Sequence, residues 1–378
     1  MKLRVLHVTE DFSSENTGVT TVLNQMTGWL TNQCDWVGIY STGKPDAPAP
    51  KGVHLFYDEG FRFPRSWRCP EELSERLREV IVQNDIQVVH LHGLWRGAPW
   101  VAQRVAESLK VPTVLSVHGQ LEPWAWSGQG IAKKLKKSIY WSLMGSPRFR
   151  NVSVLHAITP LEAKSYGKYL PGKRVKTIPN AVTLERFVQA NDQAASVPES
   201  LVFFLGRIHP IKGIDVLIEA FSRALSGTEW QLAIAGPEEV PAYANKLRYQ
   251  IKTLGLEAQV KFVGPVYDQQ KIEWLKRAWV LVAPSLTEVV GMVNLEASAC
   301  QTPTVTTFAT GLVDWCDGGG LLVNSDASSL QDALQAVASW SMEERLERGC
   351  RSRALIEKRY ALEVVGHQWL DLYSELSE

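Results

Sequence analysis

Residues 279–297 read Trp279-Val280-Leu281-Val282-Ala283-Pro284-Ser285-Leu286-Thr287-Glu288-Val289-Val290-Gly291-Met292-Val293-Asn294-Leu295-Glu296-Ala297. The continuous apolar run at the start predicts a buried parallel strand, and the small residues that follow Glu296 continue a helical pattern. The stretch therefore predicts a strand, a loop with an acid and a glycine, and a helix with a second acid in its first turn. In a parallel α/β sheet, such a loop aims backbone N–H groups and a carboxylate at the edge where ligands bind.

Strand patterns alternate with helical patterns along the rest of the chain. The first half predicts strands at 3–9, 36–40, 88–91, 113–117, 154–158 and 175–178, with helices at 18–31 and 71–83. The second half predicts strands at 201–205, 230–235, 260–263, 279–283, 304–307 and 320–323, with helices at 215–225 and 361–376. This alternation predicts the α/β class with doubly wound parallel sheets.

The length predicts two domains, because 378 residues exceed one ordinary domain. The polar stretch 189–199 is the expected linker between them. Two sheets joined by a short linker imply a cleft, with the loops at the carboxyl ends of both sets of strands facing it.

Composition narrows the class of protein. Apolar residues make up 45% and charged residues 21%, which is typical of a globular protein in water. Lys plus Arg equals Asp plus Glu at 40 each, so the net basic field of a nucleic-acid-binding protein is absent. The five cysteines form no Cys-x-x-Cys pair, which indicates reduced thiols. No signal peptide or membrane-spanning run is evident, and we expect a cytoplasmic protein.

Two cations open the second sheet, in Gly206-Arg207-Ile208-His209-Pro210-Ile211-Lys212-Gly213. Arginine offers a bidentate fork to phosphate, and lysine offers a mobile point charge. Together with helix N-termini, they could hold a diphosphate without a metal. Two solvated loop charges are the alternative reading, which the nearby glutamate pair disfavours.

The pair Gly206-Arg207…Lys212-Gly213 with Glu288-x7-Glu296 resembles the retaining glycosyltransferases of family 4, which share the GT-B fold of two Rossmann-like domains facing a cleft. The resemblance implies an acceptor-side domain of residues 1–187, completed by a crossing helix at 361–378, and a nucleotide-sugar-binding domain of residues 188–360. Supporting similarities are the strand 5–9 leading to Gly18, the segment 178–182, the segment 262–266 and Tyr360 before the last helix.

The resemblance also implies roles for single residues. Glu296 would accept hydrogen bonds from ribose hydroxyls, and Glu288 would contact hydroxyls of the donor sugar. Arg207 and Lys212 would neutralise the leaving phosphate, which fits the absence of an Asp-x-Asp element and a metal-independent reaction. The remaining donor-binding residues would be Gly18, Gly206, Gly264, Val266, Gly291, Met292 and Val293.

A third motif, His118-Gly119-Gln120-Leu121-Glu122-Pro123-Trp124, resembles a subgroup of the family with His-Gly-x-Leu-x-Pro-Trp. The resemblance makes His118 a catalytic-site residue that contacts the donor sugar, although a structural histidine is the alternative. Glu122 and Trp124 would line the acceptor site, the carboxylate binding hydroxyls and the indole stacking on a sugar ring. Structural packing is equally open for Trp124. For the fourteen tryptophans as a group, packing in the core and between domains is the favoured reading, and stacking on sugar rings is the alternative.

Two further patterns suggest binding sites. His90 and His92 share a face of a strand, but no third ligand stands at metal-site spacing, so we expect no metal. Residues 131–144 combine the lysines at 133–137 with Leu135, Ile139 and Leu143 on one helix side. That pattern indicates either a surface helix or a peripheral contact with anionic lipid at the inner face of a membrane.

The leading hypothesis is a retaining hexosyltransferase without a cofactor. It would move a hexose, glucose as the first choice, from a nucleotide diphosphate sugar to a saccharide or lipid-linked saccharide in polysaccharide or cell-envelope biosynthesis. By family frequency, a UDP-linked donor is favoured over a GDP-linked one. The alternatives are a non-catalytic sugar-nucleotide-binding protein and a GT-B nucleotide-sugar epimerase. A Rossmann dehydrogenase is excluded, since no Gly-x-Gly-x-x-Gly follows the first strand.

Overall fold

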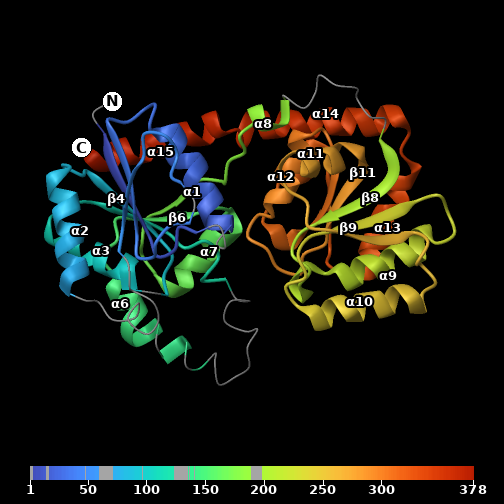
Figure 1. Cartoon of the computed structure of the whole chain (residues 1–378), viewed down its shortest axis with the longest axis horizontal. Helices are drawn as coiled ribbons and strands as arrows, with labels where there is room; N and C mark the ends of the chain where they lie inside the picture. Colours follow the sequence, from blue (N-terminus) through green and yellow to red (C-terminus); the bar gives the residue numbers. More distant parts are fainter. Residues whose placement is uncertain are drawn as a thin grey trace. The chain divides into compact units, whose positions relative to one another are not determined.

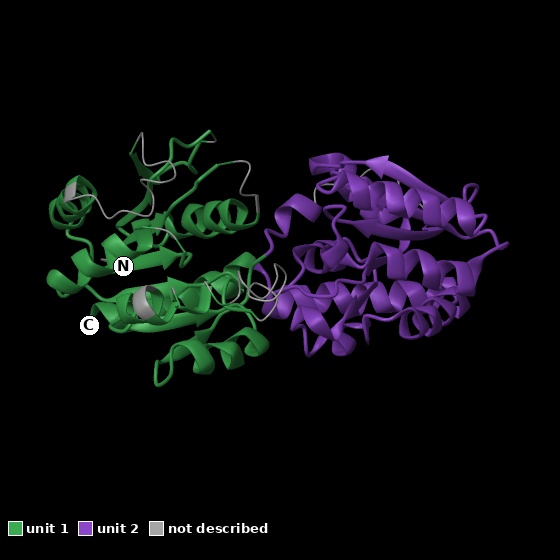
Figure 2. Cartoon of the chain, turned by 90° about the horizontal axis from the view of Figure 1, so that it is seen from below, with its two compact units in different colours: residues 1–181, 362–378 green, residues 182–361 purple. Residues whose placement is uncertain are grey.

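The computed structural model describes residues 3–13, 17–46, 48–58, 71–95, 97–122, 135, 137–139, 141–188 and 198–378. The chain forms two compact units (Figure 2): unit 1 is residues 1–181 with 362–378, and unit 2 is residues 182–361. The sequence placed the first boundary at residue 187. The structure divides the chain earlier because Val182 pairs with Ala361 in an isolated parallel bridge, and the N–H of Val182 donates to the carbonyl of Tyr360 at 2.8 Å.

Unit 1 is built on a seven-stranded parallel sheet of order β3-β2-β1-β4-β5-β6-β7. Its strands are β1 Arg4–Thr9, β2 Trp36–Ser41, β3 His54–Tyr57, β4 Val88–His92, β5 Thr113–Ser116, β6 Val154–Ala157 and β7 Val175–Thr177. The six strands expected here from the sequence are confirmed. The edge strand β3 was missed because its four residues are exposed or half-buried and its apolar run, residues 55–57, is only three residues long.

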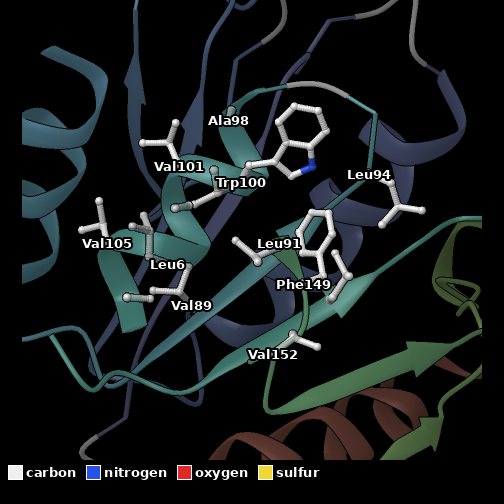
Figure 3. Packing of buried hydrophobic residues seen from close by; sticks show 14 of the residues in the cluster. Leu6, Val89, Leu91, Leu94, Ala98, Trp100, Val101, Val105, Phe149 and Val152 are labelled. Carbon is white, nitrogen blue, oxygen red and sulfur yellow. The ribbon is translucent and has the colours of Figure 1, made fainter. Parts of the chain in front are cut away.

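The helices of unit 1 pack on both faces of this sheet. They are α1 Thr17–Leu30, α2 Glu71–Gln83, α3 Gly97–Ser108, α6 Ser146–Arg148, α7 Pro160–Tyr169 and α15 Leu362–Ser377, with a π-helical turn at Trp141–Gly145. Figure 3 shows one side of the core, where Trp100 of α3 lies near Phe149 and Leu91. The guanidinium of Arg148 lies 4.0 Å from the centre of the Trp100 ring. This tryptophan therefore serves packing, one of the two uses left open above.

The last helix, α15, belongs to unit 1 and packs against α1. A Cβ built on Gly366 would lie 2.5 Å from the Trp29 ring, so only glycine permits this approach of the two helices. Trp369 and Tyr373 of α15 are buried beside the sheet. Residues 362–378 follow the whole of unit 2 in the sequence, yet they complete the core of unit 1.

Unit 2 repeats the plan with a six-stranded parallel sheet of order β10-β9-β8-β11-β12-β13. Figure 1 labels three of its neighbouring strands, β9, β8 and β11. Its strands are β8 Glu199–Leu205, β9 Gln231–Ala235, β10 Val260–Gly264, β11 Ala278–Ala283, β12 Thr304–Thr307 and β13 Leu321–Val323. Its helices are α8 Glu185–Val188, α9 Ile214–Leu225, α10 Pro241–Thr253, α11 Asp268–Arg277, α12 Met292–Ala299, α13 Ala327–Ser339 and α14 Met342–Arg359. Helices α9, α10 and α13 cover one face of the sheet, and α11 and α12 cover the other.

The two strand orders confirm the predicted architecture of two doubly wound parallel sheets. In unit 1 the order reverses between β1 and β4, and in unit 2 it reverses between β8 and β11. Ligands of open α/β sheets bind at the carboxyl ends of the strands at such a switch point. In each unit we therefore expect a binding site at the carboxyl ends of the two strands at the switch point, β1 and β4 in unit 1 and β8 and β11 in unit 2.

Candidate functional site

The site of unit 2 lies in the loops that follow the neighbouring strands β8 and β11. The N–H of Leu286, after β11, donates to the carbonyl of Ile211, after β8, at 2.8 Å. Gly213 has a left-handed φ of 65°, and a Cβ built on it would lie 2.3 Å from the carbonyl oxygen of Pro284. The two loops are therefore held against each other, with Lys212 next to the closest approach.

Lys212 and Glu288 form an ion pair across these loops. The side chains are 17% and 22% exposed, so solvent screens this pair less than it screens a surface pair. Gly291 caps helix α12 with a left-handed φ of 59°, and a Cβ built on it would lie 3.4 Å from Cγ of Glu288. An acid, a cation and a helix N-terminus thus meet at the switch point.

Helix α12 begins at Met292, and Val293 follows in its first turn. The amides of a first helical turn have no carbonyl partner within the helix, and the helix dipole adds partial positive charge. Both residues are half-buried. This end of α12 offers N–H donors to an anion beside Lys212.

The second glutamate of the motif, Glu296, is paired with Lys271 of helix α11 at 2.7 Å. Both side chains are about one fifth exposed, at 22% and 23%. Sequence reasoning missed Lys271, because it lies 25 residues away in a polar helix with no distinguishing motif. One carboxylate oxygen of Glu296 is therefore engaged by a lysine.

Arg207 pairs with Glu239 at 2.5 Å, and both side chains are about half exposed. Glu239 lies beyond the end of β9, and no sequence signal singled it out. The neighbouring glycines lie along the same edge: the N–H of Gly236 donates to the carbonyl of Gly264 at 2.9 Å, and a Cβ on Gly236 would lie 1.8 Å from the carbonyl oxygen of Gly206. Val266 is buried after β10.

The structure thus brings Lys212, Glu288 and Gly291 together. It gives Arg207 and Glu296 separate ionic partners within the same unit. Gly18, expected in the donor-binding set, lies in unit 1 in helix α1, where a Cβ would meet nothing within 4 Å. Trp124 lies outside the residues that the structure describes.

The site of unit 1 is a hollow of about 510 Å³ at its own switch point. It is lined by Val19 of helix α1 and by residues at the ends of β1, β4 and β5: Thr9, Glu10, Asp11, His92, Gly93, Leu94, Trp95, His118 and Gln120. The left-handed φ of His118, 52°, is uncommon outside glycine. The carboxylate of Glu162 accepts the N–H of Gly119 at 2.7 Å and that of Ile158 at 2.7 Å, which holds this turn.

The two carboxyl groups near this turn differ in exposure. Glu162 is buried, and burial raises its pKa. Glu122 is half-buried, and burial raises its pKa as well, while a hydrogen bond with Ser165 acts in the opposite direction. The sequence pointed to Glu122 and not to Glu162. In the structure it is Glu162 that accepts the hydrogen bonds of Gly119 and Ile158 and so holds this turn.

The expectation that His90 and His92 lack a third histidine was wrong. His7, on the adjacent strand β1, completes a group of three buried histidines, and one ring nitrogen from each lies within 4.8 Å of the other two. Parallel pairing of β1 with β4 brings these residues together, although they are far apart in the sequence.

Two family models match consecutive parts of the chain. The model described as Glycosyltransferase Family 4 matches residues 16–186, and the model described as Glycosyl transferases group 1 matches residues 186–354. In the part of the chain that the structure describes, no helix is both long and apolar enough to cross a bilayer.

Curated relatives match over shorter segments. Mannosylfructose-phosphate synthase of Agrobacterium fabrum is 29% identical over 269 residues, 64% of this chain and 58% of that protein. D-inositol 3-phosphate glycosyltransferase of Geodermatophilus obscurus is 33% identical over 198 residues, 48% of this chain and 44% of that protein. The chain thus spans about half the length of the curated relatives it matches.

Solved structures match over nearly the whole chain at low identity, and this likeness shows the fold. Sucrose-phosphate synthase from Thermosynechococcus elongatus has a TM-score of 0.73 at 18% identity, covering 99% of both chains. Anabaena Alr3699/HepE in complex with UDP and glucose has a TM-score of 0.72 at 16% identity, covering 99% of this chain and 100% of that one. The chain therefore has the GT-B fold of two parallel sheets, and glycosyltransferase family models match it consecutively over residues 16–354.

Proposed function

We propose that the protein is a retaining glycosyltransferase that moves a hexose from a UDP-linked donor to a saccharide or lipid-linked saccharide, without a divalent metal. The observation that carries this proposal is the Lys212–Glu288 pair beside the N-terminus of α12, at the switch point of unit 2. Glucose is the first sugar to test. The Anabaena protein of the same fold, solved with UDP and glucose, supports that choice.

The cations of the site suit a leaving diphosphate. Departure of a nucleoside diphosphate builds negative charge on the β-phosphate and oxocarbenium character on the sugar. Lys212, Arg207 and the first-turn amides of α12 would stabilise the phosphate charge. In other transferases a divalent metal stabilises the charge of the leaving phosphate. Here the Lys212 ammonium and the helix amides would stabilise it, so the proposed reaction is metal-independent.

The glutamates would bind hydroxyl groups rather than move protons. Glu288 is held by Lys212 and lies against Gly291, where its carboxylate would accept hydrogen bonds from the donor sugar. Glu296 keeps one oxygen on Lys271, so its other oxygen would accept from the ribose. The segment with Gly264 and Val266 would border the nucleotide base.

Retention would follow from attack on the same face of the sugar. The acceptor oxygen forms a bond to the anomeric carbon as the bond from that carbon to the β-phosphate oxygen breaks. The acceptor hydroxyl proton passes to the departing phosphate, which leaves as UDP. No side-chain nucleophile is required in this scheme.

His118, which lines the hollow of unit 1, would contact the donor sugar, and Glu122, four residues further along the chain, would bind the acceptor. A lipid-linked acceptor would suit the segment near Lys137, whose ammonium lies 5.2 Å from the centre of the Trp95 ring. Leu135 and Ile139, four residues apart, are 60% and 51% exposed, which supports peripheral contact with anionic lipid.

A donor screen tests the proposal. UDP- and GDP-sugars are added to the protein with EDTA present, and thermal protection and slow donor hydrolysis are measured. We expect UDP-glucose to protect and to be hydrolysed without a metal, and saccharides, inositol phosphate and lipid-linked saccharides are then tried as acceptors. Failure of every nucleotide sugar to bind would sink the transferase proposal, whereas a strict metal requirement would overturn its metal-independent part.

A further inference from the structure

Three histidines of unit 1 form a chain of nitrogen-to-nitrogen contacts that leads inward from the hollow. His118 Nε2 lies 3.0 Å from His92 Nδ1, and His92 Nε2 lies 3.1 Å from His7 Nδ1. His92 and His118 line the hollow, whereas His7 is fully buried. They come from the ends of β4 and β5 and from the middle of β1.

The imidazole rings of these three histidines are neutral near pH 7. Burial lowers the pKa of His7 to about 3 and that of His118 to about 4, and burial with neighbouring histidines lowers the pKa of His92 well below its ordinary value. A neutral imidazole carries one N–H and one bare nitrogen. The two contacts use two of the three hydrogens, so the third must lie at one end, on His7 Nε2 or on His118 Nδ1.

The inner end is a poor place for that hydrogen. His7 Nε2 is buried and has no hydrogen-bond partner in the described part of the chain. The neighbouring ring, His90, cannot accept from it, because both His90 nitrogens are engaged, by Tyr373 Oη at 2.6 Å and Ser116 Oγ at 2.7 Å. An orphaned buried N–H is rarer than an orphaned acceptor, so the bare nitrogen belongs on His7.

We propose that His7 and His92 are positioning residues that fix His118 as a neutral Nδ1–H donor at the hollow. In this arrangement His7 Nδ1–H donates to His92 Nε2, and His92 Nδ1–H donates to His118 Nε2. Only the identity of the ligand rests on the proposed function: His118 donates to a hydroxyl or phosphate oxygen of the nucleotide sugar. With Nε2 occupied and Nδ1 protonated, His118 does not serve as a general base.

The surrounding turn supports a fixed ring. His118 keeps a strained left-handed backbone, and the adjacent N–H of Gly119 is held by the buried Glu162 carboxylate. Among the described residues, the hydrogen bond of the His118 ring is the one to His92, which leaves Nδ1 for a ligand. The backbone and the histidine chain thus fix both the direction and the tautomer of this side chain.

Long-range ¹H–¹⁵N spectra of protein labelled with ¹⁵N-histidine report the tautomer directly. Single substitutions assign the three rings. We expect His7, His92 and His118 each to carry hydrogen on Nδ1 at pH 7. Hydrogen on Nε2 of His118, or a mixture of both forms, would overturn the proposal.

Two substitutions at His7 separate positioning from packing. The amide nitrogen of asparagine is three bonds from Cα, as Nδ1 is, so His7→Asn keeps a donor for His92, whereas His7→Leu removes it. We expect His118 to keep its tautomer in His7→Asn and to become mixed in His7→Leu. With that loss, KM for the UDP-sugar should rise about two- to tenfold at unchanged kcat. An unchanged His118 tautomer in folded His7→Leu protein would contradict the positioning role.

Zinc titration of the same sample decides between a hydrogen-bonded chain and a metal site. One nitrogen from each of His7, His90 and His92 could reach a shared metal ion, but His90 would have to give up one of its two short hydrogen bonds. We expect the spectra to stay unchanged, and stoichiometric zinc binding that removes the Nδ1–H signals would overturn the proposal. If the tautomers are as expected but no nucleotide sugar binds, the proposed function fails and the histidine chain stands.

Discussion

At the scale of single residues, each charged side chain of the unit 2 site has an ionic partner that limits its role. Lys212 holds Glu288, Lys271 holds Glu296, and Glu239 holds Arg207. A carboxylate held by a lysine is a good acceptor of hydroxyl hydrogen bonds and a poor general base. Arg207 differs, because its pair is about half exposed and can exchange Glu239 for a phosphate at small cost.

Glu296→Gln should weaken UDP-sugar binding, because the amide replaces the charged acceptor that we propose for the ribose hydroxyls. A charge-assisted hydrogen bond is worth about 1.5–3 kcal/mol, which corresponds to an affinity loss of roughly ten- to hundredfold. Titration calorimetry with UDP measures it. Glu199→Gln, which removes an exposed acid paired with Arg277, is the matched control and should bind as wild type does. Equal affinities in both variants would place the ribose elsewhere.

Arg207→Ala should chiefly reduce turnover, since charge on the β-phosphate grows as the bond to the sugar breaks. We expect kcat to fall at least tenfold with a smaller change in KM, measured by UDP release at saturating donor. Arg223→Ala removes an exposed arginine of α9 and serves as the control. A change confined to KM would mean that Arg207 binds the ground state only.

At the scale of elements, the close approach of two loops decides where Lys212 lies. The turn after β8 rests on the carbonyl of Pro284 after β11, and the absence of a side chain on Gly213 permits that contact. A similar close contact between backbones occurs where Gly236 approaches the carbonyl oxygen of Gly206, and it too leaves no room for a side chain. The carboxyl edge of the unit 2 sheet is therefore assembled by glycine contacts between neighbouring strands.

Gly213→Ala should destabilise unit 2 more than Gly227→Ala does. Both glycines have left-handed φ, 65° and 73°, but a Cβ would meet Pro284 at 2.3 Å in the first case and nothing within 4 Å in the second. The shared conformational cost is about 1–2 kcal/mol, and the clash should add about 1–3 kcal/mol at Gly213. Urea unfolding followed by tryptophan fluorescence measures the difference. Equal losses would show that the loops relax without strain.

At the scale of the whole molecule, helix α15 couples the end of the chain to the buried histidines of unit 1. The centre of its Trp369 ring lies 4.5 Å from the centre of the His156 ring and 4.9 Å from that of the His90 ring. The hydroxyl of Tyr373 forms a hydrogen bond with Nδ1 of His90. The helix therefore shields these imidazoles from water. That burial is what keeps them uncharged.

Trp369→Ala should destabilise unit 1 by about 3–5 kcal/mol, the usual cost of removing a large buried aromatic ring. Hydrogen exchange followed by mass spectrometry should show faster exchange in β1, β4 and α1, with unit 2 unchanged. Tyr249→Ala, at a residue that is 73% exposed in α10, is the control. Equal acceleration in both units would contradict the assignment of α15 to unit 1.

Acid should destabilise unit 1 through the buried histidines. Burial lowers the pKa of both His7 and His156 to about 3, whereas an unfolded histidine has a pKa of about 6.5. Between these values the unfolded chain binds more protons, so the free energy of unfolding falls as pH falls, by up to about 1.4 kcal/mol per pH unit for each histidine. Above pH 6.5 this contribution is constant.

Calorimetry between pH 4 and 7 measures that slope. His156→Gln removes one of the groups and should reduce the slope by about 1.4 kcal/mol per pH unit, whatever its effect on stability at pH 7. Replacement of the half-exposed His209 in unit 2 should leave the slope of unit 1 unchanged. An unaltered slope in His156→Gln would mean that this histidine is already charged in the folded state.

Much of this molecule follows from local sequence. Apolar runs of strand length placed every strand except β3, and the glycines and charges directly after β8 and β11 located the edge that carries Lys212 and Glu288. Such patterns are readable because the period of a strand or helix and the residues at its end are local properties. The partners of those residues are not local. Lys271, Glu239 and Glu162 carry no motif, and only strand order brings them to the site.

The histidines show the same division most clearly. The sequence marked His118 and the pair His90 and His92, but the link from His92 to His7 spans 85 residues and the link to His118 spans 26. The pairing of β1 with β4 and of β4 with β5 creates both links, and α15 from the end of the chain buries them. The sequence determined which side chains stand at the strand ends. Tertiary packing alone decided which of them touch, and so which nitrogen of His118 carries its hydrogen.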